Sequence, residues 1–306
     1  MFIPQRECMT SLPPEFVEEM LSISDYAFLC DHLMRHEETG YISAILKIQL
    51  LSYFEPATFS RKRFLDFGCG TGASTIALAK LLPETEIVGV ELDSRLVDLG
   101  NKIAVHQQAV NARLVSSPSP GRLPEDVGKF DFVMLCAVYE HLLPSERRTL
   151  MPQLWSLMKT GGVLFINQTP HRWFPFEHHS TGLWLVNYLP DTVAHWIAKR
   201  YARHNPRFNR SAEWAEHLRG GIRGGTEREI IKRLCPDKNG SATILQPTQH
   251  GLKDRADYWL ACTNTNRYRL LKKLISESFR LCDRYLGTIP SINVDVAIHK
   301  ESSISQ

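Results

Sequence analysis

The stretch RFLDFGCGTGASTIALAK, residues 63–80, decides the fold. It joins a short apolar run to a pattern typical of a helix, and it places Gly68, Gly70 and Gly72 within five positions of the connection. Glycines between a strand and a helix let the backbone approach a ligand closely, and the free N–H groups of a helix N-terminus favour an anion. The stretch therefore predicts a strand, a ligand-binding turn and a helix.

The next hundred residues repeat this alternation of apolar runs and helical patterns. Helices are expected after Gly72 and from about Ser94 and Ser145. Strands that read as continuous apolar runs and alternate with helices indicate a parallel sheet covered on both faces, and crossover handedness makes it doubly wound. We therefore predict an α/β core over residues 61–170. Its expected strands are residues 64–67, 87–92, 112–116, 132–137 and 162–167.

A helical cap is predicted ahead of this core, over residues 1–60. Apolar residues that follow Pro13 and Pro14 at spacings of three and four indicate one helix face, and a second helix is expected between Gly40 and the loop at 55–62. The first set is Phe16, Met20, Ile23, Ala27, Cys30 and Met34, and the second set is Ile42, Leu46, Leu50 and Tyr53.

After Thr169 the alternation stops, and residues 171–290 are predicted to form a mainly helical insert that contacts the substrate. A strand is expected near 242–249, and a basic helix from about Tyr268 to Leu286, with Gly287 as its C-cap. Residues 291–306 are predicted to be a final edge strand and tail, because apolar and polar residues alternate from Ile292 onward.

The composition of the 306-residue chain indicates an ordinary globular protein. It has 43% hydrophobic residues and a formal charge of +3, so the net charge does not indicate a class of binding partner. Seven scattered cysteines show neither a disulfide framework nor zinc-ligand spacing, which fits a reducing cytosol. No signal peptide or membrane-spanning run is visible, so we expect a cytoplasmic protein with no membrane span; peripheral membrane contact stays open, and no oligomeric state is indicated.

Two interpretations of the glycine turn need no family knowledge. GCGTGA, residues 68–73, fits the G-x-G-x-x-A fingerprint of dinucleotide-binding proteins, and Glu91 lies about twenty residues further on, where such proteins place an acid that binds a ribose. An NAD-dependent oxidoreductase is one alternative on this evidence. A tight turn that binds nothing is the other.

Four motifs together resemble the class I S-adenosylmethionine-dependent methyltransferases. They are LDFGCGTGAST at 65–75, VGVELD at 88–93, FDFVMLCAVYEHL at 130–142 and LMKTGGVLFI at 157–166. The resemblance covers about residues 61–170 and implies a Rossmann-like methyltransferase fold with S-adenosylmethionine as cofactor. The inserted region is similar to the accessory segments of this group, which differ with the substrate.

The resemblance also implies roles for single residues. Asp66 would lie beside the ammonium of the cofactor's methionyl part, Glu91 would accept from both ribose hydroxyls, and Leu92 would lie against adenine. An acid or amide that reads adenine in such families is replaced here by Ser116 or Ser117. The methionyl part would lie along the backbone at Gly68, Cys69, Gly70 and Gly72, and Cys136 and Ala137 would border the centre of methyl transfer.

The acceptor makes few demands on the sequence, since the sulfonium methyl is already activated. A hydroxyl acceptor benefits from a general base with a pKa near neutrality, for which histidine is suited. The candidates are His141, His171, His178 and His179, and we favour His178 or His179, which lie just past the fifth strand. The aromatic residues around them either hold the acceptor or form the insert's own core; they are Trp173, Phe174, Phe176 and Trp184.

A metal site is not predicted. Some quinone and RNA O-methyltransferases use a Glu-x-x-Glu-His motif at this strand end, but Ala137 stands here where the first glutamate should be. Glu140 and His141 are therefore expected to shape the pocket and to support the chain after the strand.

The glycine-rich stretch at 217–229 indicates a helix start and allows two interpretations of its arginines. Thr226 and Glu229 form a capping-box pattern, so a helix is expected to begin there. The surrounding arginines either bind a phosphate or carboxylate of an anionic acceptor or stay solvated in a plain turn; they are Arg219, Arg223 and Arg228.

The leading hypothesis is methyl transfer to a small or lipid-linked acceptor, at a hydroxyl. Residues 171–240 carry twelve Lys or Arg and seven Asp or Glu, a net of +5, and with the basic terminal helix they suggest a nucleic-acid methyltransferase as an alternative. No RNA-binding module is visible, so a nucleic-acid partner is not expected. A non-catalytic cofactor-binding scaffold protein is a further alternative.

Overall fold

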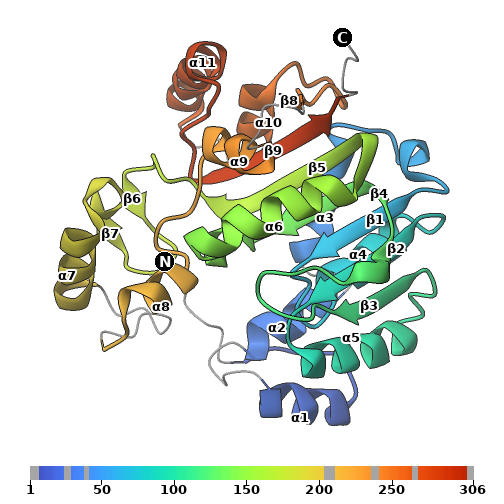
Figure 1. Ribbon diagram of the computed structural model, residues 1–306. Helices are drawn as coiled ribbons and strands as arrows, with labels where there is room; N and C mark the ends of the chain where they lie inside the picture. Colours follow the sequence, from blue (N-terminus) through green and yellow to red (C-terminus); the bar gives the residue numbers. More distant parts are fainter. Residues whose placement is uncertain are drawn as a thin grey trace.

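The computed structural model describes residues 7–23, 29–37, 41–202, 211–235, 241–263 and 268–301. Its centre is a seven-stranded sheet with the order β3-β2-β1-β4-β5-β9-β8 (Figure 1). The strands are β1 Arg63–Phe67, β2 Glu86–Glu91, β3 Ala112–Ser116, β4 Phe130–Cys136, β5 Met158–Pro170, β8 Ala242–Ile244 and β9 Asn293–Lys300. β1 to β5 are parallel to one another, whereas β9 and β8 are antiparallel to their neighbours.

The predicted doubly wound, mostly parallel sheet is therefore confirmed. The helices that connect its strands are α4 Ala73–Leu81, α5 Ser94–His106 and α6 Pro144–Leu157. Helix α5 begins after Asp93, whose carboxylate accepts from the amide of Arg95 and so caps the helix.

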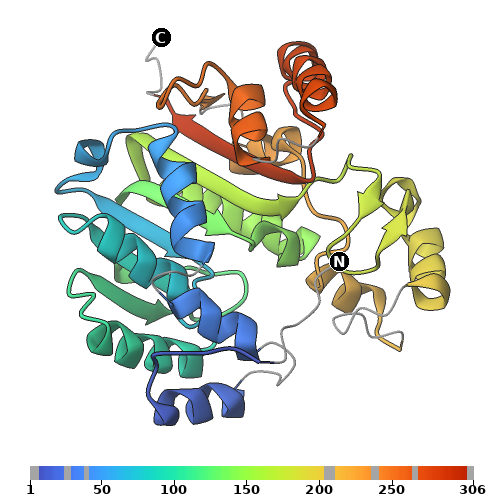
Figure 2. The same ribbon diagram turned by 180° about the vertical axis from the view of Figure 1, so that it is seen from behind.

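Successive residues of each strand enter two separate cores, since side chains alternate across a sheet. In β1, Phe64 packs in the core that includes α3, α4 and α5, whereas Leu65 packs in the core that includes α6 and α9. Both side chains are fully buried. Figure 2 shows the N-terminal helices over the first face, and Figure 1 shows α6 and α9 over the other.

The N-terminal cap contains three described helices. They are α1 Pro14–Ile23, α2 Leu29–His36 and α3 Tyr41–Leu51. The single helix face predicted from Phe16 to Met34 is divided between α1 and α2, and Ala27 and Gly40 lie outside the described residues. Met20, Leu33 and Leu46 are buried against the sheet's first core, so the cap and the sheet share one apolar interior.

The segment between β5 and β9 is mainly helical, with one short hairpin of β6 and β7. Its elements are β6 Phe176–Glu177, β7 Leu183–Trp184, α7 Asp191–Tyr201, α8 Trp214–Arg219, α9 Glu227–Leu234, α10 Arg255–Cys262 and α11 Arg269–Leu286. The basic terminal helix is confirmed as α11, and Gly287 caps it with a left-handed φ of 66°. The helix predicted at the capping-box pattern is also confirmed, because Thr226 caps α9 by accepting from the amide of Glu229.

Two strand predictions need correction. The predicted strand near 242–249 is limited to β8, Ala242–Ile244. The final strand β9 is not an edge strand, because it lies between β5 and β8, and β8 takes the edge. Alternation alone could not show this: an antiparallel strand has the same alternating pattern whether one neighbour or two bind it.

A buried polar cluster attaches the insert to the sheet. Arg255 donates to Glu227 at 2.5 Å, and Thr288 and His171 also donate to this carboxylate, at 2.5 and 3.2 Å. Burial raises the pKa of Glu227, but the hydrogen bond from His171 and the charge of Arg255 outweigh it and lower the pKa to about 2. The carboxylate therefore stays charged and connects α9, α10 and the end of β5.

Gly224 offers a test of this attachment. A Cβ at Gly224 would lie 1.9 Å from the carbonyl oxygen of Pro170, and the φ of 52° is already unfavourable for other residues. We expect Gly224→Ala to lower the free energy of unfolding by more than about 2 kcal/mol in urea titrations. The control Gly251→Ala has a φ of 77° and no heavy atom within 4 Å, so it should cost about 1 kcal/mol. Equal losses in the two variants would contradict this account.

Candidate active site

The glycine turn after β1 brings the backbone to the carboxyl end of the sheet. Gly68 and Gly70 have φ values of 75° and 56°, which favour glycine. A Cβ at Gly68 would lie 2.7 Å from Val138, whereas a Cβ at Gly70 would meet nothing within 4 Å. The amides of Gly68 and Cys69 bond to the carbonyl of Val90, so the turn is fixed while its outer face stays open to a ligand.

Gly72 has a different reason to be glycine. It precedes α4 with a φ of 84°, and a Cβ there would lie 3.0 Å from Leu114. It is not among the residues that line the two pockets described below. Its contribution is close packing of the turn against β3, and the predicted contact with the methionyl part is not supported by this placement.

Asp66 is buried under the turn. Its Oδ2 accepts from the hydroxyls of Ser74 and Thr75 at 2.6 and 2.8 Å. Burial outweighs these two hydrogen bonds and raises the pKa of Asp66 to about 6, and the charge of Glu91 adds to the rise. Asp66 lines neither of the two pockets described below, so its contact with the cofactor's ammonium stays a prediction.

Glu91 ends β2 and holds the turn in place. Its Oε2 accepts from the amide of Gly70 at 2.9 Å, and its Oε1 accepts from the amides of Leu92 and Asp93 at 2.6 and 3.3 Å. The two ends of β1 and β2 are therefore connected by one carboxylate, which retains lone pairs for ribose hydroxyls.

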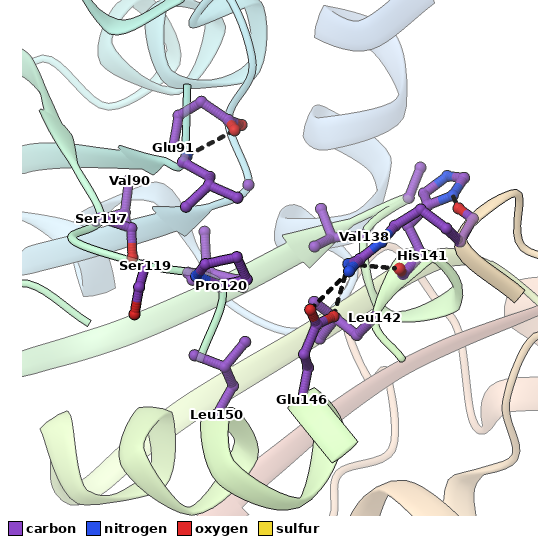
Figure 3. A pocket seen from close by; sticks show the side chains of 15 residues that line it. Val90, Glu91, Ser117, Ser119, Pro120, Val138, His141, Leu142, Glu146 and Leu150 are labelled. Atoms are coloured by element: carbon purple, nitrogen blue, oxygen red, sulfur yellow. Dashed lines mark hydrogen bonds and ion pairs between the residues drawn. The ribbon is translucent and has the colours of Figure 1, made fainter. Parts of the chain in front are cut away.

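Glu91 lies in a pocket of about 260 Å³, here called the Glu91 pocket. Figure 3 shows Glu91 and Ser117 on one side of it, and His141 and Glu146 on the other. Leu92 lines the same pocket and leaves 46% of its surface exposed, so it offers an apolar wall for a flat ring. Ser117 reaches this pocket from the end of β3, whereas Ser116, the alternative residue, does not line it.

A second pocket of about 780 Å³, here called the His178 pocket, adjoins the first. Gly68, Ala137 and His141 line both pockets and so mark where they meet. Cys69, Gly70 and Cys136 line the His178 pocket alone, on its sheet side. Most of the predicted cofactor-binding residues therefore surround two connected cavities.

The wall at the junction contains two residues with left-handed backbones. Ala137 has a φ of 56° and Gln168 a φ of 57°, which cost energy for residues other than glycine. The amide of Ala137 donates to the carbonyl oxygen of Asn167 at 2.9 Å, and the amide of Gln168 donates to the half-buried carboxylate of Asp295 at 3.0 Å. The two strained backbones are thus held by one main-chain and one side-chain hydrogen bond beside the cavity.

The four candidate histidines divide into two groups. His141, His178 and His179 line the His178 pocket. Burial lowers the pKa of His178, which keeps its ring neutral near pH 7. His171 is buried elsewhere and bonds to Glu227 and Thr288, so the structure removes it as a candidate base.

Glu177 positions the two adjacent histidines and was missed from the sequence. Its buried carboxylate accepts from the amides of His179 and Ser180, at 2.8 and 2.9 Å, and from the amide and hydroxyl of Thr181, both at 2.5 Å. Ser and Thr two to four residues after an acid are the available sequence signal, because such side chains bond to local backbone and carboxylates. Glu177 therefore fixes the backbone directly after His178.

The aromatic residues of this segment do not line either pocket. The rings of Phe176 and Trp184 lie 5.1 Å apart across the hairpin of β6 and β7. Trp173 lies against His171, at a ring distance of 6.1 Å. Neither interpretation is supported, because Trp173 and Trp184 are exposed and Phe174 and Phe176 are only half-buried.

Helix α2 contributes residues that sequence reasoning did not select. His36 bonds to the hydroxyl of Thr71 at 2.8 Å, which seats the helix on the glycine turn. Arg35 lines the His178 pocket and pairs with Asp31 at 3.1 Å, and Tyr41 donates to the same carboxylate at 2.9 Å. The amphipathic pattern of this helix gave no sign of which polar residue would face a ligand.

Two of the three arginines of the glycine-rich stretch bind protein partners. Arg223 is buried and donates to three backbone carbonyls and to Asp191. Arg219 lines the Glu91 pocket but binds both oxygens of Glu146, at 2.6 and 2.7 Å. Arg228 is exposed and lines neither pocket, so the predicted anion site at these arginines is not supported.

Comparison with known proteins identifies the class. Residues 65–164 match the family model described as a methyltransferase domain. Trans-aconitate 2-methyltransferase of Deinococcus radiodurans is 35% identical over 102 residues, 33% of this chain and 36% of that protein. Ubiquinone biosynthesis O-methyltransferase of Coxiella burnetii is 28% identical over 143 residues, 46% of this chain and 58% of that protein.

A solved structure of PKMT2 from Rickettsia typhi in complex with AdoHcy is also similar. The aligned part covers 88% of this chain and 54% of the PKMT2 chain, at 14% identity and a TM-score of 0.45. The chain spans about a third to a half of the length of the first curated relatives it matches.

Residues 65–164 are therefore a methyltransferase domain of the S-adenosylmethionine-dependent kind that the motifs indicated, and S-adenosylmethionine is the cofactor of this domain. The NAD-dependent alternative is thereby overturned. No helix among the described residues is long and apolar enough to cross a membrane.

Glu91→Ala should weaken S-adenosylmethionine binding by about 1 to 3 kcal/mol, because it removes the acceptor for the ribose hydroxyls and frees the amide of Gly70. Isothermal titration calorimetry measures this directly. Glu86→Ala is the matched control on the same strand, since Glu86 is exposed and pairs with Arg63 at the far end. Unchanged affinity in Glu91→Ala would contradict the assignment.

The affinity for S-adenosylmethionine should also depend on pH through Asp66. The ammonium favours the ionised carboxylate, so affinity is full above the pKa of about 6 and falls as pH drops through it, by at most about tenfold per pH unit. Calorimetry between pH 5 and pH 8 tests this. In Asp66→Asn this dependence should vanish, and a dependence that persists there would assign it to another group.

Proposed function

We propose that this protein transfers the methyl group of S-adenosylmethionine to a hydroxyl oxygen of a small or lipid-linked acceptor. One observation carries the proposal: the His178 pocket meets the Glu91 pocket at Ala137, with a neutral histidine facing the space beyond. The volume of about 780 Å³ lies within the range of small-molecule sites.

In this proposal the adenosine part of the cofactor occupies the Glu91 pocket. Glu91 accepts from the ribose hydroxyls, Leu92 lies against adenine, and Ser117 bonds to the adenine amine. The methionyl part then follows the glycine turn toward Asp66. The sulfonium comes to lie near Ala137, where the two pockets meet.

The reaction needs an acceptor oxygen in line with the methyl carbon and the sulfur. As the O–C bond forms, the C–S bond breaks, and the electron pair of that bond stays on sulfur in neutral S-adenosylhomocysteine. The hydroxyl proton moves to a ring nitrogen of His178, which can accept it because burial keeps the imidazole neutral. We assign the role of general base to His178, which lines the His178 pocket.

Arg35 is the residue that would recognise an anionic group. It lines the His178 pocket beside the glycine turn, whereas Arg223 is enclosed by the insert. The burial of Arg223 also removes part of the basic surface on which the nucleic-acid alternative rested. Support for a hydroxyl acceptor comes from the similarity to the Coxiella burnetii protein, which is an O-methyltransferase.

The test uses tritiated S-adenosylmethionine with hydroxylated ring compounds, with and without an alkyl tail, and with amines and RNA as competing acceptors. We expect transfer to a hydroxyl. His178→Ala should then lower kcat by about 10² to 10⁴ while cofactor affinity stays unchanged. His250→Ala is the control, since His250 is exposed and lines neither pocket. Transfer to amines or RNA alone would refute the proposal.

A further inference from the structure

Three side chains of types that bind metals, one glutamate and two histidines, lie close together at the wall of the His178 pocket. The ligand atoms of Glu140, His141 and His179 all lie within 4.8 Å of one another. Glu140 and His141 come from the short helix η4, Tyr139–His141, that follows β4, and His179 comes from the loop held by Glu177. Both histidines line the pocket, so the cluster faces the space assigned to the acceptor.

Glu140 carries a carboxylate with an unused oxygen. The side chain is fully buried, and its Oε2 accepts from the hydroxyl of Thr169 at 3.0 Å. Within the described part of the chain, Oε1 has no hydrogen-bond partner, and the nearest recorded contact is His141 Nε2 at 3.9 Å. A buried carboxylate oxygen without a donor is costly, which indicates that a cation belongs beside it.

The backbone sets the protonation of His141. Its Nδ1 lies 2.7 Å from the carbonyl oxygen of Arg219. A carbonyl only accepts, so Nδ1 donates to it, and Nε2 is the ring atom that faces Glu140, at 3.9 Å from its Oε1. Histidines that bind metals are held in this way by a carbonyl or carboxylate at the other nitrogen. Arg219 is itself fixed by Glu146.

The ring of His179 fits its place because residue 221 is glycine. A Cβ at Gly221 would lie 2.6 Å from His179 Cδ2, and its φ of 86° favours glycine in addition. The ring centre lies 5.2 Å from that of His141. Glu177 fixes the backbone of His179, so the third group of the cluster is held from two sides.

We propose that Glu140, His141 and His179 bind a divalent transition-metal ion such as Zn²⁺. Two imidazoles and one carboxylate are a ligand set that such ions prefer, and three protein ligands leave positions open. This revises the expectation of no metal: Ala137 lacks a ligand, but His179 supplies one from the insert. The role of the ion rests on the proposed function: it would coordinate the acceptor hydroxyl and lower the pKa of that hydroxyl before His178 accepts the proton.

Metal binding is tested directly, without turnover. Full-length protein is treated with a chelator, and Co²⁺ is titrated in while its visible absorption is followed; Zn²⁺ is then added as a competitor. We expect one equivalent of Co²⁺, displaced by Zn²⁺. Glu140→Gln and His179→Ala should each weaken binding by more than about tenfold. His178→Ala is the matched control, because His178 is next in sequence and lines the same pocket outside the cluster.

Calorimetry with S-adenosylmethionine shows whether each variant is folded. If Glu140→Gln does not fold, His179→Ala alone tests the metal site. No stoichiometric Co²⁺ binding, or equal losses in His178→Ala and His179→Ala, would overturn the site. Full methyl transfer by chelated protein would overturn the role of the ion but leave the proposed function standing. Loss of transfer on chelation, restored by Zn²⁺ at unchanged cofactor affinity, would support both.

Discussion

The hydrogen bond from the amide of Gly70 to the carboxylate of Glu91 is the contact on which the rest of the site depends. It joins the turn after β1 to the end of β2, and it forms only because Gly68 and Gly70 adopt left-handed backbones. Since the carboxyl ends of parallel strands meet at one edge, this single contact sets the floor of both pockets. The third strand end, at Ala137, then closes the floor from the other side.

Three buried carboxylates in this protein have contrasting surroundings. Glu227 is surrounded by charged and polar donors, including Arg255, and its pKa is lowered. Asp66 and Glu140 accept from hydroxyls, and burial outweighs these hydrogen bonds and raises the pKa of each. Glu227 stabilises the junction of insert and sheet, whereas Asp66 and Glu140 lie at the carboxyl ends of β1 and β4.

The core could be predicted from sequence because its signals are local. The first two apolar runs, the glycine turn and Glu91 lie within about thirty residues of one another, and a parallel sheet fixes how they meet. The contact between His36 and Thr71 and the meeting of His179 with Glu140 join positions that are distant in sequence. Such contacts follow from packing, and no single pattern records them. The same holds for β9, whose neighbours on both sides depend on where the short strand β8 pairs.

The insert begins and ends at neighbouring points of the sheet, since Pro170 of β5 pairs with Asn293 of β9. In topological terms it is the enlarged loop of an antiparallel hairpin, and the entropy of closing a loop rises only slowly with its length. Such a segment can be exchanged or lengthened in evolution without a shift in strand register. The family match ends at residue 164, just before this segment begins. The segment can therefore be replaced while the strands that carry the glycine turn and Glu91 keep their pairing.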